Sequence, residues 1–197
     1  MKNLSIFILL AMTMLWTPVL AQEQQDNSQL TKKEQRKLAK QQKREAEELY
    51  EQQMALVTKK MVEGSAFVLE ANMLFDKYGA SVNVNSNVNF ISIANGKGVM
   101  QLSFNNVAVG LNGIGGVTLD GKVNNYTFKE NKNGGYSVRF SLFGSGGNYD
   151  VSMSVMPGGQ ATATIRGNWS RELKYQGNLV PVDQSRVYKG FSMFGGN

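Results

Sequence analysis

The feature that most limits what this chain can fold into is a series of three segments in which apolar and polar residues alternate. They are YSVRFSLF at residues 136–143, YDVSMSV at 149–155 and ATATIR at 161–166. A period of two places successive side chains on opposite faces of a β-strand, so each segment has one apolar and one polar face. The connections GSGG and PGG are typical of tight turns. The three segments are therefore predicted to be consecutive antiparallel strands.

Five further segments have strand character, and they are residues 66–71, 88–93, 98–104, 117–128 and 173–180. The pairs Asn95-Gly96 and Asn133-Gly134 supply turn residues that tolerate positive φ. Eight short strands joined mostly by tight turns predict a mainly β fold, arranged as an antiparallel meander. We expect the meander to close into a small barrel of about eight strands, because closure removes exposed sheet edges. An open sandwich is the alternative.

The segment at residues 117–128 changes phase within its length. Its first apolar residues fall on one face, and its two aromatic residues fall on the other. The first set is Val117, Leu119 and Val123, and the second set is Tyr126 and Phe128. A phase change of this kind predicts a bulge or sharp bend near Asn124 and Asn125.

The stretch GLNGIGG at residues 110–116 raises the possibility of a phosphate-binding loop. A dinucleotide loop requires G-x-G-x-x-G between a strand and a helix, and here the third glycine is missing. The residues that follow, VTLDGKV, alternate like a strand, so no helix N-terminus is available to hold an anion. We therefore predict a glycine-rich turn that leads into a strand and would border the opening of a barrel.

The first 21 residues, MKNLSIFILLAMTMLWTPVLA, have the features of a secretory signal peptide. Lys2 precedes an apolar run, and small residues lead to Ala21, where we expect cleavage. The apolar run is shorter than the roughly 20 residues that a spanning helix needs, so no transmembrane span is expected in the mature chain. The chain has no cysteine, which excludes a lipoprotein anchor at the cleavage site. We expect an exported protein, periplasmic or secreted.

A polar stretch and a helix are predicted between the signal peptide and the strands. Residues 22–30 lack periodicity and are predicted to be a disordered linker. Residues 31–63 are strong helix formers and end at Gly64. The first half of this helix is almost entirely polar, whereas the second half carries apolar residues at helical spacing and can dock. The predicted organisation continues with a barrel domain at residues 64–190 and a glycine-rich tail at 191–197.

Most catalytic chemistry is excluded by residue types. The chain has no histidine and no cysteine, which removes the imidazole base, the thiolate nucleophile and nearly all zinc and copper sites. The patterns G-x-S-x-G and S-x-x-K are also absent. We expect no catalytic residue, no metal and no cofactor, with a hydrolase that uses paired carboxylates as the one exception. The formal net charge of +6 is spread over the chain, so no nucleic-acid partner is expected.

Candidate ligand-binding residues come from two observations. Small side chains at Ala161 and Ala163 opposite bulky ones would leave room inside a barrel, although a large neighbour could equally fill it. Residues 167–190 interleave aromatic and basic side chains, which can stack on a ligand or can cap the barrel instead. The candidates are Phe140, Tyr149, Met153, Ala161, Ala163, Trp169, Tyr175, Arg186 and Tyr188.

Four stretches in this order resemble one family. They are SAFVLEANMLF, GIGGVTLDGKV, YDVSMSVMPGGQATATIRGNW and LVPVDQSRVYKG. Over residues 65–190 the chain is similar to the domain of unknown function 4251 family, known mainly from exported proteins of Gram-negative gut bacteria. The resemblance implies a lipocalin-like antiparallel barrel, and it implies no activity, ligand or catalytic residue.

Two functions are compatible with these observations. The first is a non-enzymatic module that binds a small, partly apolar ligand in the barrel or at its mouth. The alternative is a cell-envelope interaction protein in which the helix at residues 31–63 is the surface for a protein partner. A cavity of ligand size inside the barrel would favour the first.

Overall fold

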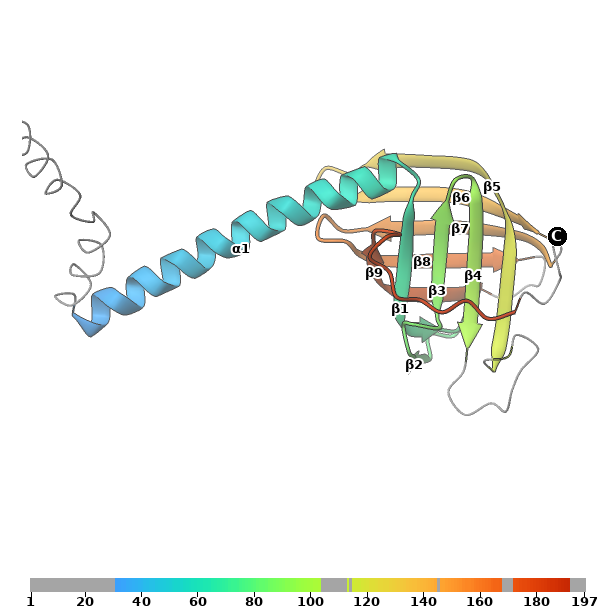
Figure 1. Ribbon diagram of the computed structural model, residues 1–197, viewed down its shortest axis with the longest axis horizontal. Coiled ribbons are helices and arrows are strands. Elements are labelled where there is room, and N and C mark those ends of the chain that lie inside the picture. The colour runs from blue at the N-terminus through green and yellow to red at the C-terminus, as the bar shows by residue number, and fades with distance from the viewer. Residues whose placement is uncertain (1–30, 104–112, 114, 145, 168–171, 192–197) are drawn as a thin grey trace, which may run out of the picture. The chain divides into compact units, whose positions relative to one another are not determined.

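The protein is described by a computed structural model that covers residues 31–103, 113, 115–144, 146–167 and 172–191. In these residues, one helix precedes nine strands (Figure 1): α1 (Lys32–Glu63), β1 (Phe67–Phe75), β2 (Ser81–Asn83), β3 (Phe90–Ala94), β4 (Lys97–Ser103), β5 (Gly116–Glu130), β6 (Tyr136–Gly144), β7 (Gly147–Val155), β8 (Gln160–Gly167) and β9 (Glu172–Val180). The predicted signal peptide (1–21) and linker (22–30), and all but the first residue of the predicted tail (191–197), lie outside the described residues.

The strands form one antiparallel sheet in the order β2-β1-β3-β4-β5-β6-β7-β8-β9, and β1 also pairs with β9. This additional pairing closes β1 and β3 to β9 into a barrel of eight strands, which confirms the predicted fold class. The ninth strand, β2, was not among the predicted segments. It pairs with the last residues of β1, where Met73 lies opposite Asn83 and Phe75 lies opposite Ser81.

The predicted irregularity in β5 is confirmed. The register between β5 and β6 shifts between Asn124 and Thr127, and Asn125 has a φ of 55°. Asparagine adopts this left-handed conformation more readily than most residues. The shift turns Tyr126 toward the inside, where its ring stacks on Phe140 at a centroid distance of 6.3 Å.

One end of the barrel is closed by the last turns of α1. Thr58, Met61 and Val62 are buried there, and Met61 and Val62 belong to the barrel core. The Tyr126 hydroxyl donates to the Val62 carbonyl oxygen at 2.6 Å. Gly159, in the turn between β7 and β8, lies against Thr58 at the same end. Only the last turns of the helix therefore dock on the barrel, because Leu49, Tyr50 and Leu56 in its apolar second half are exposed.

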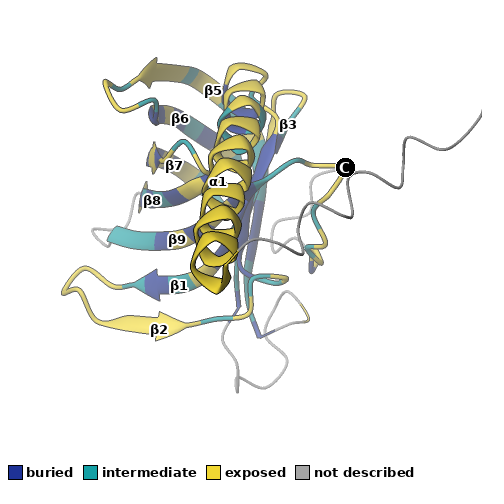
Figure 2. Ribbon diagram, turned by 90° about the vertical axis from the view of Figure 1, so that its left-hand side faces the viewer, coloured by how far each residue is buried: buried dark blue, intermediate teal, exposed yellow. Residues whose placement is uncertain are grey.

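The chain forms two compact units, Met1–Glu48 and Leu49–Asn197, and the barrel lies in the second. In the first unit, every described residue is exposed, as the yellow part of α1 shows (Figure 2). Within the described part of the chain, no helix combines the length and the apolarity that crossing a membrane requires.

After β9, a segment that we call the strap (residues 181–191) runs over the outer face of β1, β3, β4 and β5 (Figure 1). Ser185 donates to the Glu70 carboxylate on β1 at 2.7 Å, and Lys189 forms an ion pair with Asp120 on β5 at 2.6 Å. Val68 and Phe90 alternate with inward-facing core residues, yet each is only 2% exposed. The strap explains why this outer face is buried.

Candidate ligand-binding pocket

A cavity of about 570 Å³ lies at the barrel end opposite to α1. It is bordered by the turn after β1, by the last residues of β4 and β8, and by the first residues of β5, β7 and β9. These positions meet because antiparallel strands bring alternating ends to the same rim. The lining residues are Asp76, Lys77, Tyr78, Met100, Leu102, Val117, Leu119, Tyr149, Ile165, Gly167, Glu172, Leu173 and Tyr175. We call this cavity the mouth pocket.

The wall of the mouth pocket is mostly apolar. Met100, Leu119 and Ile165 are buried members of the barrel core that face this cavity. Leu102, Val117 and Leu173 are partly buried and pack against the same core. Apolar side chains on neighbouring strands share the inner face because each strand alternates with a period of two. The wall is therefore suited to the apolar body of a ligand.

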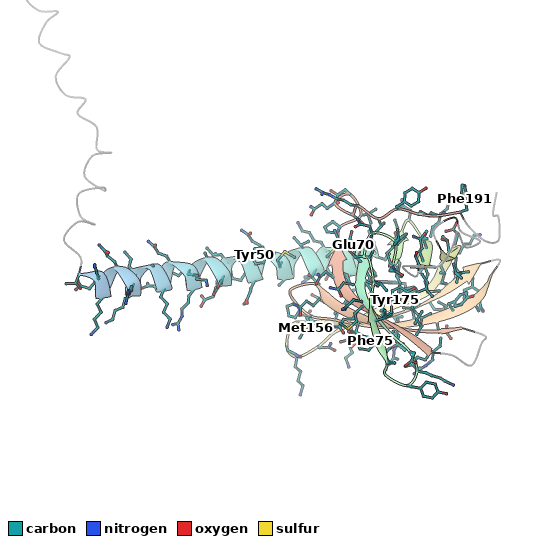
Figure 3. The ribbon with its side chains drawn as sticks, turned by 90° about the horizontal axis from the view of Figure 1, so that it is seen from below. Tyr50, Glu70, Phe75, Met156, Tyr175 and Phe191 are labelled. Carbon is teal, nitrogen blue, oxygen red and sulfur yellow. The ribbon has the colours of Figure 1, made fainter. Side chains whose placement is uncertain are left out.

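Of the β9 residues that line the pocket, Tyr175 lies farthest along the strand from the rim; Figure 3 labels its side chain. It is fully buried on β9, and its hydroxyl donates to the main-chain carbonyl oxygen of Gln101 on β4 at 3.0 Å. Because β1 and β3 lie between β9 and β4 in the sheet, this bond spans the interior of the barrel. Burial raises the pKa of Tyr175 above its ordinary value, so the hydroxyl remains a neutral donor.

Tyr149 forms part of the side wall, next to Gly167. Its hydroxyl donates to the Gly146 carbonyl oxygen at 3.0 Å. A Cβ atom at Gly167 would lie only 2.8 Å from the Tyr149 ring, so the ring takes the space that a larger residue at position 167 would need. Burial raises the pKa of Tyr149 as well.

Among the described residues, the rim of the pocket carries three charged side chains, and two of them are carboxylates with close donors. The Oδ1 atom of Asp76 accepts the main-chain N–H groups of Tyr78 and Ala80 at 2.8 and 2.9 Å. Glu172 accepts from the Arg166 guanidinium at 2.8 Å and lies 3.4 Å from the Lys174 ammonium. The hydrogen bond from Arg166 is the main cause that lowers the pKa of Glu172.

The third charged residue at the rim is Lys77. Its Nζ atom lies 4.7 Å from the centroid of the Tyr78 ring, which is a cation–π arrangement. Within the described ranges, Lys77 forms no ion pair with a carboxylate. Of the three charged rim residues, Lys77 is therefore the one whose side chain has no hydrogen-bonding partner among the described residues.

The predicted site residues are only partly brought together. Tyr149 and Tyr175 line the mouth pocket. Phe140, Met153 and Ala163 are buried in the core but do not line it. Ala163 lies directly opposite Tyr175, which indicates why its small side chain leaves no space there. Ala161 borders a second, mostly polar hollow of about 430 Å³, with neighbours such as Thr162 and Gln176.

The C-terminal candidates lie elsewhere. Arg186 and Tyr188 are exposed residues of the strap, on the outer side of the sheet. Trp169 lies outside the described residues, as do four residues of the glycine-rich stretch at 110–116. Of that stretch, Gly113 and Gly115 have positive φ values of 78° and 80°, and Gly116 begins β5.

Several pocket residues were not predicted, above all Met100, Leu102, Ile165, Leu173 and Lys77. Strand alternation places the first four on the inner face, but it does not reveal which end of the barrel is open. For metals, the described residues contain no group of three or more Asp, Glu, His or Cys side chains that could hold an ion.

Comparisons with known proteins find one family. A family model described as a domain of unknown function (DUF4251) matches residues 46–179. The crystal structure of a DUF4251 family protein from Bacteroides eggerthii is similar to this chain, with 35% sequence identity and a TM-score of 0.56. The match covers 68% of this chain and 90% of that chain. A comparison with curated proteins gives no match.

Proposed function

The chain belongs to the DUF4251 family, and because that family's description states no activity, we propose a function from the pocket: the barrel is a non-enzymatic module that binds a small, partly apolar ligand. The observation that carries the proposal is the mouth pocket of about 570 Å³ with its apolar wall.

Size and chemistry both support this proposal. Pockets for small molecules typically have volumes of about 300–1,000 Å³, and they combine an apolar lining with a few polar groups. An interior enclosed by eight strands is wide enough for side chains to fill it or for one small ligand to bind. In this barrel, side chains fill the part of the interior near α1, and the mouth pocket leaves space for a ligand at the other end. Tyr175 lies between these two parts.

We propose that the protein is exported from the cytoplasm and acts in the periplasm or outside the cell. Residues 1–21 have the composition of a signal peptide cleaved after Ala21, and the barrel contains no cysteine that would need a reducing compartment. A periplasmic or secreted barrel that binds an apolar compound would carry it through water. This part of the proposal is tested by sequencing the N-terminus of the protein recovered from its native host, which should begin at Gln22.

Filling the pocket is expected to abolish most of the binding. N-phenyl-1-naphthylamine is an uncharged probe whose fluorescence rises in apolar surroundings. The substitution Leu173→Trp places a larger ring in the pocket wall and should weaken binding of this probe at least about tenfold, equivalent to about 1.4 kcal/mol. The smaller change Val117→Phe should weaken binding less. It replaces Leu173→Trp in the test if Leu173→Trp lowers the melting temperature markedly.

The matched control is Phe143→Trp. Phe143 lies on β6 with its side chain on the exposed outer face, so the same ring is added to the barrel without entering the pocket. This variant should bind the probe like the wild type. The proposal is contradicted if the wild type does not bind the probe, or if folded pocket-filled variants bind it as well as the control.

A second candidate function uses the first half of α1 as a surface for an envelope partner. Residues 32–44 contain seven basic residues and one acidic residue, and all of them are exposed. Four glutamates then follow without a basic residue, at Glu45, Glu47, Glu48 and Glu51. A concentrated block of positive charge on an exposed helix is suited to an acidic partner surface.

Deleting residues 22–43 tests this second function. We expect the urea midpoint of the barrel to change little, because the deleted part belongs to the other compact unit. A partner that is cross-linked to the exported protein in its native host should be lost, and it should also be lost when seven basic residues at 32–44 are replaced by glutamine. Retention of every cross-linked partner in both variants would contradict this function.

A further inference from the structure

We propose that the mouth pocket selects an amphiphile with an apolar body and one anionic head group, and that Lys77 binds the head group. This inference rests on the proposed function and specifies the class of its ligand. It comes from the distribution of charge around the rim rather than from the volume of the cavity.

Lys77 lies where the polar end of such a ligand would emerge from the pocket. Lys77 lies in the turn between β1 and β2 at the exposed rim, whereas the apolar wall extends inward to Tyr175. Tyr78, next to it, is 83% exposed and holds its ring beneath the ammonium. An apolar body on the wall would therefore bring a polar head group to the turn at residues 76–78.

The expected charge of the head group follows from which charged side chains at the rim already have bonded partners. Both carboxylates already accept hydrogen bonds, Asp76 from two main-chain N–H groups and Glu172 from Arg166. At Glu172, a cationic head group would compete with the Arg166 and Lys174 side chains. The Lys77 ammonium has only the face of an aromatic ring beside it among the described residues, so an anion can approach it without breaking an ion pair.

The cations next to the rim also outweigh its carboxylates. Asp76, Lys77 and Glu172, the charged lining residues that the structure describes, sum to −1. The two cations that pair with Glu172, Arg166 and Lys174, do not line the pocket, and with them the group sums to +1. The head group would lie near water, so its attraction to Lys77 is that of an exposed ion pair. Such pairs contribute about 0.2–1 kcal/mol, and they weaken as salt increases.

A matched pair of probes tests the inference. The anion 8-anilino-1-naphthalenesulfonate has the ring system of N-phenyl-1-naphthylamine and adds one sulfonate. Lys77→Glu both removes the attraction and adds a repulsion, so it should weaken binding of the sulfonate about fivefold at low salt. Binding of the uncharged probe should change less than twofold. Lys77→Gln should have a smaller effect of the same sign.

The control is Lys132→Glu, which makes the same charge change in the exposed turn between β5 and β6, at the opposite end of the barrel. It should leave the affinity for both probes within about twofold of the wild type. Leu173→Trp should weaken binding of both probes, which shows that the sulfonate binds in the mouth pocket. Circular dichroism verifies that each variant is folded.

The outcomes separate the inference from the function on which it depends. If the wild type binds neither probe, the proposed function is wrong. If both probes bind and Leu173→Trp blocks them, but Lys77→Glu leaves the sulfonate affinity unchanged, the function stands and this inference is overturned. A second assay on the wild type identifies the source of the head group: sodium decanoate below its micellar concentration and phosphatidylglycerol vesicles are added as competitors of the bound sulfonate. Displacement by decanoate indicates a free amphiphile, displacement by vesicles alone indicates a lipid head group, and displacement by neither contradicts the inference.

Discussion

Replacing Tyr175 by alanine is expected to lower the free energy of unfolding by roughly 3–5 kcal/mol, the usual cost of removing a large buried ring. Tyr175 is fully buried, and it is the largest of the fully buried side chains. The substitution would leave a void continuous with the mouth pocket and would remove the bond that joins β9 to the Gln101 carbonyl oxygen. Urea denaturation followed by circular dichroism measures the loss.

The variant Tyr175→Phe keeps the ring and removes only the hydroxyl, so it should cost about 1 kcal/mol. The native pKa of Tyr175 lies above the value of about 10 in the unfolded chain, so its stabilising contribution is complete below pH 10 and declines as the pH rises further. The difference between the wild type and Tyr175→Phe should therefore shrink above pH 10. If Tyr175→Ala and Tyr175→Phe cost the same, the ring does not fill the interior as described.

Replacing Gln101 by leucine is expected to lower the free energy of unfolding by roughly 3 kcal/mol, because buried polar groups would lose their partner. Gln101 is fully buried between the sheet and the strap. Its amide donates to the carbonyl oxygens of Val88 and Tyr188 at 3.0 and 2.8 Å. Its carbonyl oxygen accepts from the Thr118 hydroxyl at 2.9 Å and from the Gly190 N–H group at 2.8 Å.

The control for this variant is Gln176→Leu, since Gln176 is an exposed glutamine on the outer face of β9. It should change the free energy of unfolding by less than about 0.5 kcal/mol. In Gln101→Leu, trypsin should also cut faster after Arg186 and Lys189, because both residues lie in the strap. Equal stability and equal cleavage rates in the two variants would show that the strap is not held by Gln101.

The barrel could be predicted from the alternation of apolar and polar residues. This pattern is clear where one face of a strand is buried and the other is exposed to solvent. Segments such as 136–143 and 149–155 have this character, and they correspond to β6 and β7. The bulge in β5 could be predicted for the same reason, since Tyr126 departs from the phase of Val123. Alternation failed for β2, whose three residues are all exposed and which is held by pairing with β1 alone.

The pocket was harder to predict because alternation gives the face of a residue but not its depth. Ala163 and Leu119 both point inward, yet Ala163 packs beside Tyr175 and does not line the cavity, whereas Leu119 is part of the cavity wall. The difference depends on α1, which closes one end, and this is a long-range contact. The strap is a second such contact, because it buries Gln101, a polar residue that alternation places on the outside.

The central claim is that an apolar molecule binds inside the mouth pocket, and proton–proton nuclear Overhauser effects from bound N-phenyl-1-naphthylamine to methyl groups test it most directly. The account predicts cross-peaks to Met100, Leu119 and Ile165, which face the cavity from three strands. It also predicts none to Leu38 of α1, which is exposed and lies in the other compact unit. Cross-peaks to Leu38 without any to the three pocket residues would contradict the account.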